Sequence, residues 1–196
     1  LLSIPKRPDV QIIVVDDNSD EDKKASIVEN DNIKLLCISK TESKGAGRAR
    51  NYGVKEASGK WILFPDCDDF YAPNFLEKLD VFLDSGNDIV YFNIFDGYDE
   101  EKKQCVKIDK GSAVLRRYAQ NRDDKVYEKN VKHLRNACWD MMIKKEFVDS
   151  HGLKFEEVKK GNDALFKHGA AIYARDIDVI LDKIYYWVLN KNSLTH

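Results

Sequence analysis

The residues best suited to chemistry are the aspartates of the segment 66–69 (DCDD), which directly follows the apolar run 61–64 (WILF). A buried strand would deliver these carboxylates to one turn, with Asp66 and Asp68 on the same side if the strand geometry persists. Clustered carboxylates repel one another, and Mg²⁺ or Mn²⁺ shared with substrate phosphates relieves that repulsion. The alternative is a solvated acidic turn before a helix, which is the more common explanation for an isolated D-x-D pattern.

A second acidic turn, 16–20 (DDNSD), follows the β-branched run 11–15 (QIIVV). Carboxylates such as Asp16 and Asp17 at the end of a buried strand can accept hydrogen bonds from a nucleotide base or from ribose hydroxyls. The same residue types also cap helices well. Both interpretations stay open for this turn.

A glycine-rich loop, 44–48 (KGAGR), opens a predicted helix that runs to about residue 57. Glycines let the backbone approach a ligand closely, and a helix start favours anions such as phosphate. The spacing matches neither a phosphate loop nor a dinucleotide fingerprint. A contact between Arg48 and phosphate is therefore an expectation beside a simpler one, a helix start with basic side chains in solvent.

The segment Gly161-Asn162-Asp163 opens another predicted helix. A carboxylate there is commonly a cap or a partner of the helix dipole. On its own, the segment favours that structural role over a catalytic one.

The elements that must position these residues alternate through the first half of the chain. Apolar β-branched runs favour buried strands, and apolar residues at helical spacing favour helices. The pattern predicts strands at 11–15, 33–38, 61–64 and 89–95. Helices are expected at 21–29, from the loop 44–48 to about residue 57, and from Pro73 to the turn 85–87. This order is typical of an α/β layered sheet, mostly parallel and flanked by helices, which gathers ligands at the carboxyl ends of its strands.

The second half is harder to interpret. The charged region 96–135 predicts a hairpin followed by one or two surface helices. Further elements are expected at 137–143 (strand), 145–151 (helix), 162–174 (helix) and 179–189 (strand, with a turn near 182–183). A length of 196 residues fits one domain, in which we distinguish a first half, 1–95, from a second half, 96–196.

Composition excludes some classes of protein. The formal net charge of −2 leaves no basic surplus for nucleic acid. The four cysteines form no C-x-x-C pair, which predicts free thiols in a reducing compartment. No apolar run approaches the length of a membrane span, and no secretory signal is visible. We therefore expect a cytoplasmic protein, with attachment to the inner face of the membrane left open.

Together these segments resemble glycosyltransferase family 2, whose fold is called GT-A. The segments 14–20, 45–64 and 66–73 match the family's first acidic turn, the stretch before its metal motif, and the metal motif itself, in the right order. The stretch 155–166 is similar to the family's catalytic-base segment, which usually has Glu-Asp where this chain has Asn162-Asp163. The resemblance also implies that the family's first strand lies before Leu1.

The resemblance implies a metal-dependent transfer of a sugar from a nucleoside diphosphate, most readily a UDP-sugar, to a sugar or glycan hydroxyl with inversion. Such chemistry serves polysaccharide or glycan assembly. The implied roles are Asp163 as catalytic base, Asp68 and Asp69 at the Mn²⁺ or Mg²⁺ ion, and Asp16, Asp17, Arg48 and Asp66 at the nucleotide-sugar.

Two other functions compete with this one. A domain of the same fold could bind a nucleotide-sugar or a partner protein without turnover, and Asn162 motivates that alternative. A phosphotransferase of the haloacid dehalogenase type also places D-x-D after an apolar strand. That class needs Thr or Val shortly afterwards, where this chain has Asp69-Phe70.

Overall fold

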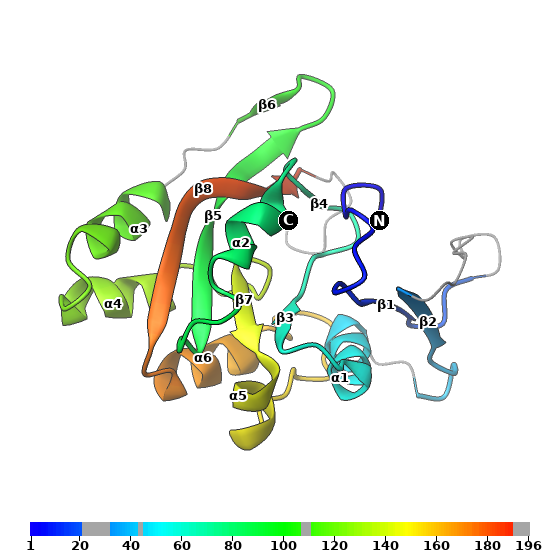
Figure 1. Ribbon diagram of the computed structural model, residues 1–196. Coiled ribbons are helices and arrows are strands. Elements are labelled where there is room, and N and C mark those ends of the chain that lie inside the picture. Colours follow the sequence, from blue (N-terminus) through cyan, green and yellow to red (C-terminus); the bar gives the residue numbers. More distant parts are fainter. Residues whose placement is uncertain (21–31, 43–44, 107–110, 190–196) are drawn as a thin grey trace.

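The computed structural model describes residues 1–20, 32–42, 45–106 and 111–189 of the chain (Figure 1). Its strands are β1 (Ile12–Asp16), β2 (Ile33–Cys37), β3 (Trp61–Leu63), β4 (Phe70–Tyr71), β5 (Ile89–Asp99), β6 (Gln104–Cys105), β7 (Met141–Lys144) and β8 (Ile177–Val188). Its helices are α1 (Ala46–Glu56), α2 (Phe75–Asp80), α3 (Gly111–Gln120), α4 (Lys125–Lys132), α5 (Lys145–Ser150) and α6 (Ala164–Tyr173).

The strands form two sheets. β1 and β2 make a parallel pair, and the larger sheet has the order β3-β7-β5-β8-β4, with β6 paired to β5. The long β5–β8 pairing is parallel, whereas β7 runs antiparallel to both of its neighbours, β3 and β5. The α/β class with flanking helices is confirmed, but the sheet is more mixed than the alternating pattern predicts. Hydrophobic patterning identifies a strand without specifying the direction in which it pairs. It also overstates the burial of β1, which was expected to be a buried strand but whose residues are all only half-buried.

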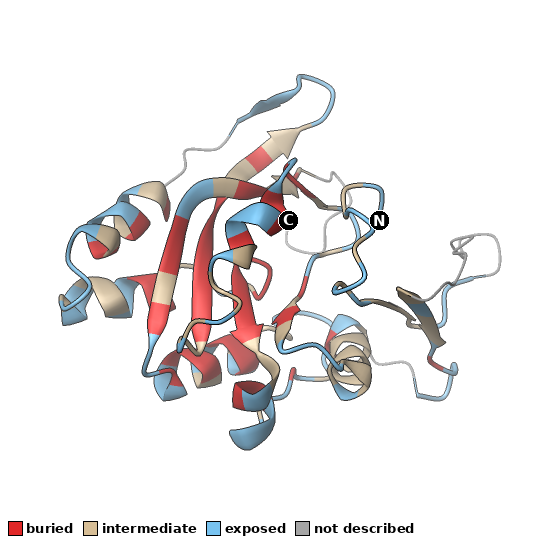
Figure 2. Ribbon diagram, viewed as in Figure 1, coloured by how far each residue is buried: buried red, intermediate tan, exposed pale blue. Residues whose placement is uncertain are grey.

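The core lies on both faces of β5, β7 and β8, which are buried along most of their length (Figure 2). Successive side chains of a strand point to opposite faces, and β5 therefore serves two clusters. Ile89 and Tyr91 pack toward α3 and α6, whereas Val90 and Phe92 pack toward α2. A strand buried on both faces reads as a continuous apolar run, which is why β5 was recognisable from sequence.

Most predicted elements are present. The region 96–135 contains the expected hairpin, β5–β6, and two helices, α3 and α4. The turn expected near 182–183 is wrong, because β8 pairs with β5 on both sides of this point. A register shift occurs there instead, between Phe92 and Asn93 and again before Ile94, as a β-bulge produces. The helix predicted at 21–29 lies outside the described residues.

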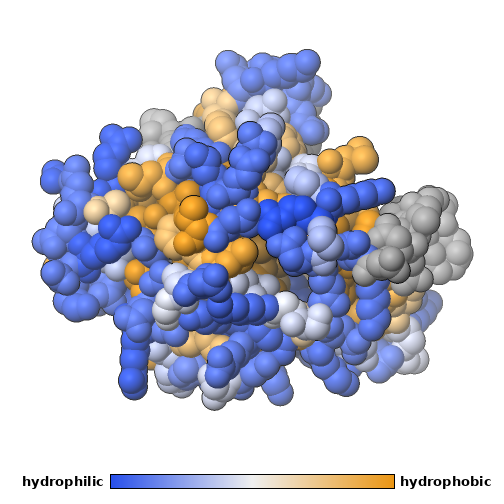
Figure 3. Space-filling view, in the orientation of Figure 1, coloured by the Kyte–Doolittle hydropathy of each residue, from blue (hydrophilic) through white to orange (hydrophobic). Residues whose placement is uncertain are grey.

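The surface and the thiols agree with the composition. Figure 3 shows polar side chains over most of one face, with apolar ones gathered near its middle. Across the described ranges, no helix combines the length and the apolar character that crossing a bilayer requires. All four cysteines are free, as expected, with Cys138 buried and the other three exposed.

A buried ion pair holds α6 against the sheet. The Nζ atom of Lys167 lies 2.6 Å from Oδ1 of Asp140, and the two side chains are 1% and 2% exposed. Arg135 approaches the second Asp140 oxygen at 3.5 Å, and Lys167 lies 4.6 Å from the centroid of the Tyr91 ring. Since α6 follows directly after Asp163, this pair helps to fix the position of the candidate base.

We expect Asp140→Ala to lower the free energy of unfolding by about 3–5 kcal/mol, because it leaves the Lys167 charge buried without its carboxylate. Urea unfolding followed by circular dichroism measures the loss. The matched control is Asp149→Ala, which removes a surface pair with Lys145 whose aspartate is 55% exposed and should cost less than about 1 kcal/mol. Equal losses in the two variants would contradict a structural role for the buried pair.

Candidate active site

Three carboxylates meet in the turn between β3 and β4. Ligand atoms of Asp66, Asp68 and Asp69 all lie within 4.8 Å of one another, and the Asp69 amide closes the turn by donating to the Asp66 carbonyl at 3.2 Å. Asp68 is exposed, whereas Asp66 and Asp69 are half-buried. Hard oxygen ligands at this spacing suit Mg²⁺ or Mn²⁺, so the residues fit a divalent cation.

Tyr185 of β8 connects this acidic turn to the sheet. Its hydroxyl donates to Oδ2 of Asp69 at 2.7 Å and accepts from the Asp66 amide at 2.9 Å. The Val188 amide donates to the other Asp69 oxygen at 2.8 Å. Both Asp69 oxygens thus accept hydrogen bonds from β8. Asp68 is more exposed than Asp69 and is therefore more accessible to a cation.

Burial dominates the electrostatics of the turn. It raises the pKa of Asp69 to about 7, and the neighbouring Asp66 and Asp68 charges add to the rise. The hydrogen bonds from Tyr185 and Val188 oppose it. Burial also raises the pKa of Asp66, although Arg50 opposes this shift. Burial therefore disfavours the ionised forms of Asp66 and Asp69.

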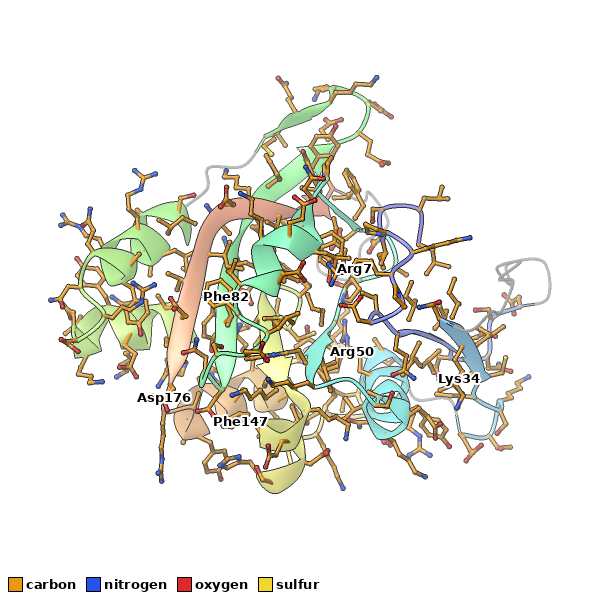
Figure 4. The ribbon with its side chains drawn as sticks, in the orientation of Figure 1. Arg7, Lys34, Arg50, Phe82, Phe147 and Asp176 are labelled. Carbon is orange, nitrogen blue, oxygen red and sulfur yellow. The ribbon has the colours of Figure 1, made fainter. Side chains whose placement is uncertain are left out.

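Arg50 of α1, labelled in Figure 4, joins the acidic turn to the segment that contains Asp163. Its Nη2 donates to Oδ1 of Asp66 at 2.5 Å, and its Nη1 donates to Oδ1 of Asp163 at 2.6 Å and to Oδ1 of Asn162 at 2.7 Å. The side chain is only 15% exposed. Sequence reasoning selected Arg48 and missed Arg50, whose one visible signal is its place in the family-like segment after the glycine loop.

The start of α1 is packed closely against residues 155–157. A Cβ atom on Gly47 would lie 1.9 Å from the Glu156 carbonyl oxygen, so only glycine fits. The Asn51 side chain donates to the Phe155 carbonyl at 3.0 Å and accepts from the Phe155 amide at 2.9 Å. Phe155 in turn stacks on Phe166 of α6, with ring centroids 4.0 Å apart. Helix α1 therefore positions the candidate base from both backbone and side-chain contacts.

Asp163 precedes α6 without capping it. No side-chain cap hydrogen bond forms there. The carboxylate is 17% exposed and faces Arg50. The Cys138 thiol approaches Oδ2 at 3.7 Å, and burial raises the pKa of that thiol well above its usual value. The protonated thiol is a weak donor to this carboxylate.

The first acidic turn lies at the carboxyl end of β1. Asp16 accepts a hydrogen bond from the Ser19 amide at 3.0 Å, and Asp17 accepts one from the Gly45 amide at 2.7 Å. Asp16 thus has the turn-stabilising role that its residue type suggests. Asp17 links the end of β1 to the glycine loop that opens α1.

Arg48 lies on a different side of α1 from Arg50. Its Nη1 donates to Oε1 of Glu157 at 3.0 Å, and its guanidinium lies 5.1 Å from the centroid of the Tyr52 ring. The structure does not place it against the 66–69 turn. Its contact with a nucleotide-sugar stays a prediction.

A surface cavity of about 760 Å³ lies at the opposite end of β3 from the acidic turn, and Lys60, Lys144 and Asp149 are among its lining residues. None of the candidate site residues lines it. We therefore place the candidate site at the clustered aspartates, whose carboxylates could bind a cation, rather than in this cavity.

Comparisons with known proteins identify the family. The sequence model of glycosyl transferase family 2 matches residues 1–152. The chain belongs to this family, as its motifs and their order predicted.

The relatives include transferases that act on sugars. The poly(ribitol-phosphate) beta-N-acetylglucosaminyltransferase TarS of Staphylococcus aureus is 27% identical over 191 residues, which cover 95% of this chain and 31% of TarS. The Escherichia coli UDP-Glc:alpha-D-GlcNAc-diphosphoundecaprenol beta-1,3-glucosyltransferase WfgD is 31% identical over 84 residues, 42% of this chain and 33% of WfgD. The chain spans about half or less of the length of the relatives it matches.

The fold also matches solved structures. The crystal structure of TarS 1–349 with UDP-GlcNAc superposes with a TM-score of 0.68 at 20% identity, covering 93% of this chain and 50% of that one. The likeness confirms the GT-A fold expected from sequence.

We expect Asp69 to make stability depend on pH when divalent cations are removed. The folded protein holds a proton on this carboxyl between about pH 4 and about pH 7, whereas the unfolded chain has released it. This contribution to stability is therefore largest near pH 4 and is lost as the pH rises to about 7. Urea unfolding in EDTA across this range, for the wild type and Asp69→Asn, measures it.

Asp84→Asn is the control for this experiment, because Asp84 is fully exposed and should leave the pH profile unchanged. The prediction fails if the free energy of unfolding of Asp69→Asn changes with pH as steeply as that of the wild type between these pH values.

Proposed function

We propose that this chain is the catalytic domain of a metal-dependent, inverting glycosyltransferase. It moves a sugar from a nucleoside-diphosphate sugar to an acceptor hydroxyl. The observation that carries the proposal is the cluster of Asp66, Asp68 and Asp69 within 4.8 Å at the end of β3, in a chain that belongs to glycosyl transferase family 2.

The donor side is proposed to use the acidic turns. Asp68, supported by Asp69, would hold Mn²⁺ or Mg²⁺, which when bound stabilises the charge on the leaving diphosphate. Asp66 would contact the ribose or support the cation. Asp16 and Asp17 would contact the base or ribose, and Arg48 the phosphates. A UDP-sugar is favoured because the matched TarS structure contains UDP-GlcNAc and the name of WfgD contains UDP-Glc.

The acceptor side is proposed to use Asp163 as a general base. An ionised carboxylate that takes the proton of the attacking hydroxyl supports a single in-line displacement, which inverts the anomeric carbon. Such a base is typically worth about 10²–10⁴-fold in rate. The thiol of Cys138 and the guanidinium of Arg50 orient this carboxylate by the contacts described above.

The proposal extends to substrate and location. We assign the donor to residues 1–95 and a sugar or glycan acceptor to residues 96–196, in polysaccharide or glycan assembly. The names of TarS and WfgD specify a poly(ribitol-phosphate) and a diphosphoundecaprenol acceptor, respectively. An acceptor of the second kind is a lipid, which would bring a cytoplasmic enzyme to the inner face of a membrane.

We expect one nucleotide among UDP, GDP, dTDP and CMP to raise the melting temperature, and only with Mn²⁺. A ligand at one hundred times its dissociation constant adds about 2.7 kcal/mol to stability. Differential scanning fluorimetry measures the shift. Asp68→Ala should abolish it, because it removes the exposed carboxylate of the cluster, whereas Asp84→Ala at an exposed surface position should keep it. No shift with any nucleotide would argue against a donor site.

We expect Asp163→Asn to lower kcat by about 10²–10⁴-fold, because the amide cannot take the acceptor proton. The nucleotide-dependent melting shift should remain, since Asp163 is not part of the 66–69 cluster. Release of nucleoside diphosphate from the donor that binds, with and without sugar acceptors, measures the rate. A wild-type protein that binds nucleotide without any transfer or donor hydrolysis would instead be a binding module.

A further inference from the structure

We propose that Arg50 is a positioning residue that sets the distance between the donor site and the catalytic base before either substrate binds. The inference rests on the proposed function and extends it to Arg50, which was not among the site residues predicted from the sequence. Arg50 contacts Asp66 on the donor side and Asp163 on the acceptor side through separate nitrogen atoms of one guanidinium.

The geometry matches the rigidity of the guanidinium. Its planar fork fixes the angle between its donors, so two carboxylates bound to different nitrogens cannot shift independently. Each carboxylate gives Arg50 only its Oδ1 atom. Cys138 contacts the other oxygen of Asp163, Oδ2. One oxygen of the candidate base is thus held by Arg50, and the other faces the weak donor Cys138.

The charge balance explains why a cation is needed at this point. Asp66 and Asp163 come from distant parts of the chain; Asp66 is half-buried and the side chain of Asp163 is 17% exposed. Two like charges brought together in this way repel unless a cation lies between them. Asn162 adds a neutral amide oxygen to Nη1, the nitrogen that also binds Asp163, without adding a third negative charge.

Arg50 is itself held rigidly. It lies on α1, whose first turn is locked against residues 155–157 by Gly47 and Asn51. Its guanidinium also lies 5.4 Å from the centroid of the Phe155 ring, a favourable cation–π arrangement. The distance between donor and base is therefore a property of the folded protein, which is the condition for preorganised catalysis.

Loss of Arg50 should act on turnover more than on donor binding. Misplacing a reacting group by about 1 Å can cost about 10²-fold in rate, so we expect Arg50→Ala to lower kcat by about that factor. The cation site retains all three aspartates, so KM for the donor should change far less. Arg50→Lys keeps the charge without the fork and should recover only part of kcat.

Chemical rescue separates positioning from a merely structural role. Guanidinium added to Arg50→Ala, well below concentrations that unfold the protein, should recover about tenfold in kcat, the change expected for regaining one charge-assisted hydrogen bond. Urea has the same shape without the charge and should give no recovery. Arg122→Ala is the matched control, because Arg122 pairs with Asp178 on an exposed surface away from the site.

The outcomes are distinct. If the wild type is active and Arg50→Ala keeps its kcat, or urea rescues it as well as guanidinium does, the inference is wrong while the proposed function stands. If the wild type neither binds nucleotide nor transfers sugar, both are wrong. Should Arg50→Ala fail to fold, Arg50→Lys decides the question: a wild-type kcat in a folded Arg50→Lys protein would overturn the inference.

Discussion

The arrangement of the candidate site depends on how the protein offsets the repulsion between carboxylates that the fold brings close together. Asp66 and Asp163 are both partly shielded from solvent and share one guanidinium, that of Arg50. Each negative charge would be costly at its position without a neighbouring cation. Arg50 supplies that cation from a third element, α1. The acidic turn itself lacks such compensation at Asp69, where burial raises the pKa to about 7, and this deficit is what a divalent cation would relieve.

The sheet holds the acidic turn and the candidate base in position. β8 runs parallel to β5 through the core, and its Tyr185 hydroxyl contacts both ends of the acidic turn. On the other side, the buried pair of Lys167 and Asp140 holds α6 against β7. The acidic turn and the candidate base are therefore each anchored to the core by a polar contact. Arg50 then joins the two anchored segments through one guanidinium, which bonds to Asp66 and to Asp163.

Several candidate site residues were recognisable because their signals are local. The aspartates of the 66–69 turn follow an apolar run that favours a strand, and their ligand atoms lie within 4.8 Å of one another. Asp69 is less free to bind a cation than its place in the motif suggests, because both of its oxygens accept hydrogen bonds from β8. That contact joins residues more than one hundred positions apart, and no pattern within the motif indicates it.

Local sequence determined the buried strands, the glycine loop and the acidic turns, since hydrophobic periodicity and turn chemistry act between near neighbours. The match to glycosyl transferase family 2 followed from their order. Only the tertiary structure decided which arginine of α1 faces the site. Arg48 and Arg50 are two residues apart, and positions at that spacing lie on different sides of a helix. Packing of Gly47 against Glu156 sets the rotation of α1, and that contact turns Arg50 toward the two carboxylates.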